Sequence, residues 1–232
     1  MKLFEWDEQK NLINRQKHGI DFVAATAVYD DPNRLEMDCT QSGQGEIRTK
    51  TIGQMDGLFI VAVVSTDRAQ RIRLISARLA SKNERKHYAM RQQGNPAQPR
   101  GSNMPITVER TNGAVMQLMA DGSKRAIEDS TDWARLKAMT EQNIDAAAQA
   151  DIDNPPLTDE ELKTLRPVPN PKEIRKRLKM TQQQFATRFE LPLGTLRDWE
   201  QHVREPDSAA KSYLRVIAKN PEAVLQALAD PL

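Results

Sequence analysis

Residues 46–78 read EIRTKTIGQMDGLFIVAVVSTDRAQRIRLISAR and contain three successive runs with the character of β-strands. The first run (46–53) and the last (71–78) alternate polar and apolar residues, whereas the middle run (58–65) is almost entirely apolar. Alternation indicates a strand with one buried face, and a continuous apolar run indicates a strand buried on both faces. Because Asp56-Gly57 is a hairpin signal, we expect an antiparallel sheet with the middle run at its centre.

Helical patterns flank these strands. Residues 7–18 form a charged, helix-like segment that ends at Gly19, a residue suited to a helix C-cap. A second helix is expected over residues 21–29, before Pro32, and a closing helix over residues 81–92. This order of elements predicts a small α+β domain with an antiparallel sheet.

The composition is that of a polar protein with more than one domain. The 232 residues include 38% hydrophobic and only 5% aromatic residues, which argues against one large core. No apolar run reaches the roughly 20 residues of a membrane helix, and the N-terminal residues lack the apolar stretch of a signal peptide. The single Cys39 cannot form an internal disulfide, so we expect a reducing cytoplasm.

A composition break divides the chain after residue 93. The stretch from Gln92 to Asn103, QQGNPAQPRGSN, is polar, rich in Gly and Pro and without periodicity, so we interpret residues 94–103 as a linker. Met104 follows the linker directly, as the first residue of a separate protein would. The chain is therefore interpreted as two proteins joined by either a natural gene fusion or an engineered tether. Residues 1–103 hold 16 Lys and Arg against 12 Asp and Glu, whereas the remainder holds 18 against 20. The two halves therefore carry opposite net charges that could neutralise each other, although neither value is extreme.

The second half begins with short elements. We expect a hairpin over residues 106–119 that turns at Asn112-Gly113, and a helical region over residues 130–150. The next stretch, DIDNPPLTDEELKTLRPVPNP (151–171), has five prolines and several acids. It is expected to be extended, partly disordered and suited to wrapping a partner.

The C-terminal part has the pattern of a helix-turn-helix. A basic helix over residues 172–179 is followed by Thr181, which is expected to N-cap a second helix with Gln184 at the capping-box position. Leu191-Pro192 marks a break, and a third helix carries Leu196 and Trp199 inward. An alternative interpretation is a helical bundle whose basic residues are merely solvated.

The segment TQQQFATRFELPLGTLRDWEQHVREP (181–206) also resembles the Xre-type repressor family. This resemblance implies DNA binding, with Arg197 suited to guanine edges or phosphate and Gln201 suited to adenine. Lys172, Arg175, Lys176 and Arg204 would contact phosphates. The implied DNA-binding residues are Gln182, Gln183, Gly194, Thr195, Arg197, Asp198, Gln201 and Arg204.

Basic residues also recur in the N-terminal domain. Arg48 and Lys50 alternate along one expected strand, and Arg71 and Arg73 along another, so each pair shares a face. Such a surface is either a basic floor for RNA or the solvated outer face of the sheet.

Two motifs favour the RNA interpretation. FEWDEQKNLINRQKHGIDF (4–22) and RLISARLASKNERKHY (73–88) resemble the opening and the ending of BrnT-type toxins. The resemblance implies a RelE-like fold and a metal-independent ribonuclease that blocks translation without a cofactor. The implied catalytic candidates are Lys17, His18, Arg71, Arg73, Arg78 and Tyr88, and the RNA-binding candidates are Arg48, Lys50, Arg85 and Lys86. His18 is the more plausible base because of its pKa range, but it could equally be a helix C-terminal cap.

Residues 132–166, DWARLKAMTEQNIDAAAQADIDNPPLTDEELKTLR, resemble the core of BrnA-type antitoxins. This implies that the segment binds and silences the toxin, with its apolar helix as the anchor and its acids on the basic face. The implied toxin-binding residues are Trp133, Leu136, Met139, Asp159 and Glu160, and Asp151, Asp153 and Glu161 belong to the same acidic group. An alternative is that this segment is only an interdomain spacer.

The sequence therefore predicts a type II toxin–antitoxin pair in one chain. Residues 1–93 would be a RelE-like toxin, residues 104–168 its antitoxin region, and residues 169–232 a domain that represses its own operator. Because operator recognition normally uses two helix-turn-helix units, we expect a dimer or a larger assembly. The alternatives are a transcriptional repressor whose N-terminal domain senses a ligand or partner, and an active nuclease tethered to DNA.

Overall fold

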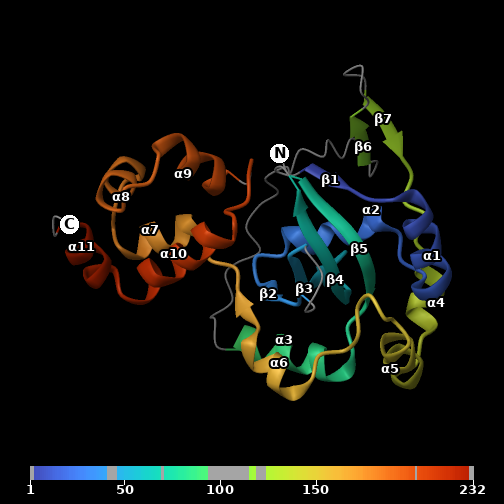
Figure 1. The fold of residues 1–232 in the computed structure, drawn as a ribbon. Coiled ribbons are helices and arrows are strands. Elements are labelled where there is room, and N and C mark those ends of the chain that lie inside the picture. The colour runs from blue at the N-terminus through green and yellow to red at the C-terminus, as the bar shows by residue number, and fades with distance from the viewer. Residues whose placement is uncertain are drawn as a thin grey trace. The chain divides into compact units, whose positions relative to one another are not determined.

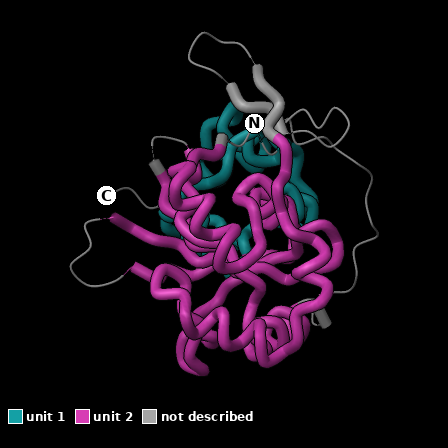
Figure 2. The backbone as a smooth tube through the Cα atoms, turned by 90° about the vertical axis from the view of Figure 1, so that its right-hand side faces the viewer, with its two compact units in different colours: residues 1–2, 168–232 teal, residues 3–167 magenta. Residues whose placement is uncertain are grey.

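The computed structural model describes residues 3–40, 46–68, 71–93, 115–118, 124–201 and 203–229. They belong to two compact units, residues 3–167 and residues 168–232, which Figure 2 colours magenta and teal. Each unit has its own hydrophobic core. None of the helices within these described ranges is long and apolar enough to cross a membrane.

The larger unit is built around one sheet with helices packed against it (Figure 1). Its elements, in chain order, are β1 (Leu3–Glu5), α1 (Glu8–His18), α2 (Phe22–Ala25), η1 (Thr26–Asp30), β2 (Leu35–Asp38), β3 (Arg48–Met55), β4 (Phe59–Arg68), β5 (Arg71–Leu79), α3 (Lys82–Gln93), β6 (Val115–Leu118), β7 (Lys124–Ile127), α4 (Trp133–Ala138), α5 (Glu141–Gln149), α6 (Asp159–Thr164) and β8 (Arg166–Pro167).

The three strands expected from the sequence form the middle of this sheet. β3 pairs with β4 and β4 with β5, both antiparallel, in the sheet order β1-β5-β4-β3-β2-β8. The turn between β3 and β4 places Asp56 at φ 52° and Gly57 at φ 70°, the left-handed pair that a tight hairpin requires. The first helix likewise begins after Asp7, whose side chain accepts from Lys10 N, and ends at Gly19 with φ 73°.

The expectation of a purely antiparallel sheet is wrong, because the sheet is mixed. β1 pairs in parallel with β5, in the register Leu3↔Arg71 to Glu5↔Arg73. A parallel neighbour requires a long crossover, and here the chain between the two strands supplies α1, α2 and three other strands. A strand of three residues is too short to show an alternating pattern, so the sequence did not reveal it.

Hydrophobic cores lie on both faces of the sheet. Val61 and Val63 of β4 point into the core formed with α2 and η1. Ala62, between them in sequence, belongs to the opposite core with Tyr88 of α3 and Leu162 of α6. Figure 1 shows α3 and α6 side by side beneath the strands, so both faces are covered.

The chain after the linker is integral to this unit. The helical region expected at residues 130–150 is two helices, because Thr140 interrupts it and caps α5 by accepting from Asn143 N. The stretch expected to be extended contains α6, which begins with a capping box between Thr158 and Glu161. It then adds β8 antiparallel to β2 at the sheet edge.

Two predicted features lie outside the described residues, namely the linker at residues 94–103 and the turn at Asn112-Gly113. Within the described part of that region, β6 and β7 pair antiparallel as a separate two-stranded sheet.

The C-terminal unit consists of short helices. They are α7 (Pro171–Arg177), α8 (Gln182–Arg188), α9 (Leu193–Glu200), α10 (Ser208–Lys219) and α11 (Pro221–Ala229). The predicted capping box between Thr181 and Gln184 is present at the start of α8. Phe185, Leu196 and Trp199 share one core with residues of α10 and α11.

Candidate functional site

A buried imidazole and a buried hydroxyl meet on one carboxylate in the larger unit. His18 is the last residue of α1 and is only 5% exposed, and its Nε2 lies 3.0 Å from Asp151 Oδ2. Ser76 of β5 donates its hydroxyl to the same oxygen at 2.7 Å. Burial raises the pKa of Asp151, but the hydrogen bonds from His18 and Ser76 outweigh it and hold that pKa well below its usual range. Asp151 is therefore a buried, ionised carboxylate.

A second group of polar side chains centres on Glu84. Arg78 is 1% exposed and donates to both carboxylate oxygens of Glu84, at 2.8 and 3.0 Å. Lys50 Nζ lies 3.8 Å from Glu84 Oε1. Burial raises the pKa of Glu84, but the hydrogen bonds and charge of Arg78 lower it overall to about 2. Burial, reinforced by the charge of Arg78, lowers the pKa of Lys50 to about 8.

The sheet register explains why these side chains share a face. Lys50 of β3 and Ser76 of β5 both lie opposite Val64 of β4. Residues directly opposite one another in a sheet point to the same side, and Arg78 follows Ser76 by two residues. His18 approaches from the end of α1, so three segments that are distant in sequence form one cationic site.

One short segment from after the linker occupies this site. Besides Asp151, the carbonyl oxygen of Asn154 accepts from Arg78 Nε at 2.6 Å, and that of Pro155 accepts from Lys50 Nζ. Asn154 also donates its side-chain amide to Ala62 O at 2.8 Å, and Leu157 N donates to Glu84 at 3.1 Å. We call residues 151–157 the plug, because they satisfy the polar groups of the site.

The helices on either side anchor the plug. Leu136 is buried in the core that also contains Phe22 and Ala25 of α2, and Met139 packs against the same core. The ring centroids of Trp133 and Phe59 are 6.0 Å apart. Arg135 donates to the carbonyl oxygens of Gln16 and Lys17, the last turn of α1. On the other side, Leu157, Leu162 and Leu165 join the core beneath the sheet.

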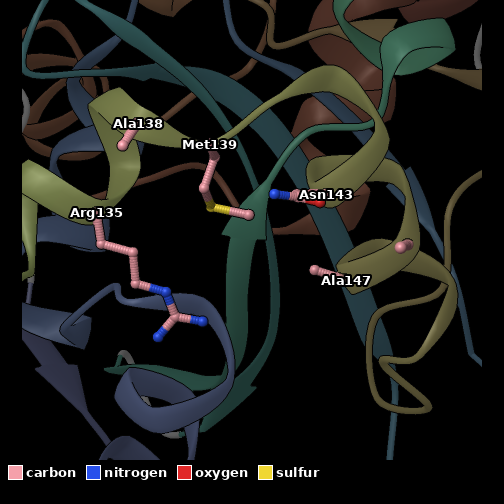
Figure 3. A pocket seen from close by; sticks show the side chains of 6 residues that line it. Arg135, Ala138, Met139, Asn143 and Ala147 are labelled. Atoms are coloured by element: carbon pink, nitrogen blue, oxygen red, sulfur yellow. The ribbon is translucent and has the colours of Figure 1, made fainter.

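Arg135 and Met139 also line a pocket of about 420 Å³ between α4 and α5 (Figure 3). Its other lining residues are Ala138, Asn143, Ala146 and Ala147. This pocket shares no residue with the cationic site.

The other predicted nuclease residues are placed differently. Lys17 and Lys86 are exposed, and Arg71 forms an ion pair with Glu5 of β1 at 3.6 Å. Arg73 lies opposite Thr66 of β4, and Thr66 is two residues from Val64, the partner of Ser76. Arg73 is therefore on the same face of the sheet as Ser76 and Arg78, further along β5. The Tyr88 hydroxyl donates to Asp31, and Arg85 donates to Ala80 O and Glu141. Arg48 Nη1 lies 3.8 Å from Asp153 at the edge of the plug.

The two acids predicted to bind the toxin lie away from the cationic site. Asp159 and Glu160 are exposed in the first turn of α6, and Glu160 pairs with Lys163. Sequence reasoning missed Ser76, Asn154 and the bridging role of Glu84. The spacing of Ser76 two residues before Arg78 was the available signal for the first of these.

In the C-terminal unit, some predicted DNA-binding residues are engaged within the unit and others are exposed. Gln182 donates to Glu200 at 2.9 Å, and Arg175 donates to both carboxylate oxygens of Glu200. Gly194, Arg197 and Gln201 are exposed on or just after α9, at positions that share one helix face. Thr195 is half-buried, Gln183 contacts Thr187, and Arg204 lies 3.7 Å from Asp198.

Comparison with known proteins identifies the domain that carries the cationic site. Residues 6–84 match the family described as ribonuclease toxin, BrnT, of type II toxin–antitoxin system. These residues belong to the BrnT toxin family. His18, Lys50, Ser76, Arg78 and Glu84 all lie in this BrnT domain, whereas the plug lies outside it.

Two solved structures are similar to parts of the chain. The ribonuclease toxin BrnT of Brucella abortus is 30% identical, over 35% of this chain and 100% of that one, with a TM-score of 0.29. An HTH XRE-family-like protein of Agrobacterium tumefaciens is 53% identical, over 26% of this chain and 97% of that one, with a TM-score of 0.26. Among curated proteins, none matches the chain. Among the residues the structure describes, no three His, Cys, Asp or Glu side chains are grouped to hold a metal ion.

Proposed function

We propose that this chain combines a ribonuclease toxin with its own inhibitor and a DNA-binding unit. The BrnT domain cleaves RNA when free, residues 128–167 neutralise it, and the C-terminal unit binds operator DNA. The observation that carries the proposal is the plug, because it engages the buried polar groups of the BrnT domain with a carboxylate and two carbonyl oxygens.

The residues of the site suit RNA cleavage by the ribose 2′-hydroxyl. That oxygen attacks the adjacent phosphorus, the bond to the 5′-oxygen breaks, and the departing 5′-oxygen takes a proton from water. A cyclic phosphate and a 5′-hydroxyl result. His18 accepts the proton from the 2′-hydroxyl, since an imidazole transfers protons near neutral pH. Lys50 and Arg78 stabilise the negative charge that develops on the phosphorane. Their pairing with the plug excludes RNA from all three groups.

The C-terminal unit supports the DNA-binding part of the proposal. Gly194, Arg197 and Gln201 offer a small residue, a guanidinium and an amide on one exposed face, and these groups suit base edges and phosphates in a major groove. An added Cβ at Gly194 would meet nothing within 4 Å, so this face is open. Operator recognition would use two copies of the unit, and hence a dimer or larger assembly.

A growth assay in bacteria tests the proposal. Residues 1–93 are induced alone, and then together with residues 104–232 supplied separately, while translation and RNA integrity are followed. We expect growth arrest with loss of translation, and rescue by the second fragment. A fragment carrying both His18→Ala and Lys50→Met is the control and should be harmless at the same expression level. Harmless expression of the folded unsubstituted fragment would refute the nuclease and favour a repressor with a sensing N-terminal domain.

A further inference from the structure

Asp151 is held by the BrnT domain in the way that a protein holds a bound anion. Its Oδ2 lies 3.0 Å from His18 Nε2 and accepts from Ser76 Oγ at 2.7 Å. Its Oδ1 accepts from the backbone N–H of Asp153, within the plug itself. The side chains of His18, Ser76 and Asp151 are each at least nine-tenths buried, so the carboxylate is removed from water. Burial of a carboxylate is tolerable when hydrogen-bond donors and a basic side chain lie this close to it.

The oxygen atoms that follow Asp151 continue the same arrangement. Arg78 and Lys50 bind the carbonyl oxygens of Asn154 and Pro155, which are uncharged. The plug thus presents one anionic group and then two neutral acceptors along an extended backbone. A single RNA strand likewise presents anionic phosphates alternating with neutral sugar and base oxygens.

The neighbouring acid of the plug differs from Asp151. Asp153 is about one-third exposed and pairs with Lys10 at 3.0 Å and with Arg48 at 3.8 Å. Its partners are long, partly exposed side chains, whereas those of Asp151 are short and fixed by α1 and β5. Of these two acids, only Asp151 fills a buried site.

We propose that the pocket of His18 and Ser76 is a phosphate-binding site of the BrnT domain and that Asp151 occupies it as a stand-in for a phosphate group. Ser76 is thereby a substrate-binding residue, donating to a non-bridging phosphate oxygen. That this phosphate belongs to RNA rests on the proposed function, whereas the existence of the anion site does not.

Removal of the Asp151 side chain from the full chain tests the site with inorganic phosphate as the probe. Thermal unfolding is followed for the unsubstituted chain, Asp151→Ala and Asp153→Ala, in phosphate and in chloride of equal ionic strength. Phosphate should raise the melting temperature of Asp151→Ala by about 3 °C relative to chloride, because a ligand that binds only the folded state stabilises it. The unsubstituted chain and Asp153→Ala should show no such difference. An equal response of Asp151→Ala and Asp153→Ala would overturn the proposal.

A further substitution assigns the site. Ser76→Ala in the Asp151→Ala background should weaken phosphate binding by about tenfold, since one hydrogen bond to a charged group is lost. In the NMR spectrum, phosphate should shift the ring signals of His18 and leave those of His87 in place. A phosphate response that survives Ser76→Ala and leaves His18 unchanged would refute the assignment.

Asp151→Ser provides a second way to vacate the site. If neither variant folds in chloride, recovery of the folded state in phosphate supports the proposal, and failure to recover overturns it. The nuclease is judged separately by growth arrest. Phosphate binding without toxicity would refute the proposed function and leave the anion site standing, whereas toxicity without phosphate binding would refute the anion site alone.

Discussion

The substitution Glu84→Gln measures how much the most buried carboxylate of the cationic site contributes to the free energy of unfolding. Glu84 is 0% exposed and accepts from Arg78 twice, from Ser81 N and from Leu157 N. A glutamine keeps the shape of the side chain but removes its charge. Its amide N–H group would face the N–H donors that the carboxylate oxygens now accept from. Arg78 would then be a buried cation without its counter-ion, a change that typically costs about 3–5 kcal/mol.

The pKa of Glu84 gives an independent magnitude. That pKa falls from an ordinary 4.5 to about 2, and each pKa unit corresponds to about 1.4 kcal/mol, so the ionised group contributes about 3 kcal/mol to the free energy of unfolding. Because the pKa is lowered by folding, this stabilisation is complete above pH 4.5 and is lost as the pH falls towards 2. Asp151, whose pKa is also lowered, adds to the same acid sensitivity.

Urea unfolding of the full chain at pH 7 and at stepwise lower pH measures both effects. In a Trp199→Phe background the remaining tryptophans, Trp6 and Trp133, both report on residues 3–167. Glu84→Gln should lower the free energy of unfolding by about 3 kcal/mol at pH 7 and flatten its decline below pH 4.5. Glu160→Gln, on an exposed side chain, is the matched control and should change neither. A loss below about 1 kcal/mol at pH 7, or an unchanged acid slope, would refute the reasoning.

Three further substitutions probe the other parts of the chain. Arg197→Ala should weaken binding to operator DNA by about tenfold or more in fluorescence anisotropy, whereas Lys219→Ala on α10 should not. Leu136→Ala should lower the stability of the larger unit by about 2–5 kcal/mol in thermal unfolding, with Lys137→Ala as the exposed control. Lys50→Met should abolish RNA cleavage by the free toxin. It should change the stability of the full chain little at pH 7, because the cost of burying an ammonium is removed while Arg78 still pairs with Glu84.

Opposite results would each remove one step of the argument. An Arg197→Ala chain with full DNA affinity would place the DNA-binding face elsewhere than on α9. A Leu136→Ala chain as stable as the Lys137→Ala chain would show that α4 does not anchor the plug. A free toxin that still cleaves RNA with Lys50→Met would exclude Lys50 from the chemistry.

Features set by neighbouring residues could be predicted from the sequence. The cap at Asp7, the left-handed Gly19 and the capping box at Thr181 each depend on contacts within four residues. The hairpin at Asp56-Gly57 is equally local. Such rules predicted most helices and the three central strands, because the residues that determine these elements lie close together in the sequence.

Features set by distant pairing could not be predicted. β1 pairs with β5, nearly seventy residues away in the sequence. The two residues of β8 pair with β2, which comes from another part of the chain. The irregularity in the pairing after Val64 puts Arg73 on the same face as Ser76 and Arg78, although regular alternation would place residues five apart on opposite faces. One unpaired residue in a ladder shifts which side chains share a face, and the sequence carries no local mark of it.

The choice among the acids of the plug region shows the same limit. Charge counting placed the acids of residues 151–161 on the basic face as a group, but the structure buries only Asp151 on His18. Asp159 and Glu160 start α6, where negative charge near a helix N-terminus is favourable without any partner. Charge alone does not distinguish an acid in the first turn of a helix from one that fills a cationic site.

The distribution of contacts around the plug explains how one chain could keep a toxin inactive. The plug itself is short, and two of its three acceptors are backbone carbonyls, which any sequence would provide. Its position is fixed from outside, by Leu136 on one side and by Leu157, Leu162 and β8 on the other. Because the proposed inhibitor belongs to the same chain as the BrnT domain, its effective concentration at the site is high even when one anchor is weakened. Loss of a single anchor should therefore reduce stability well before it releases activity, and release would require that both flanks separate from the sheet together.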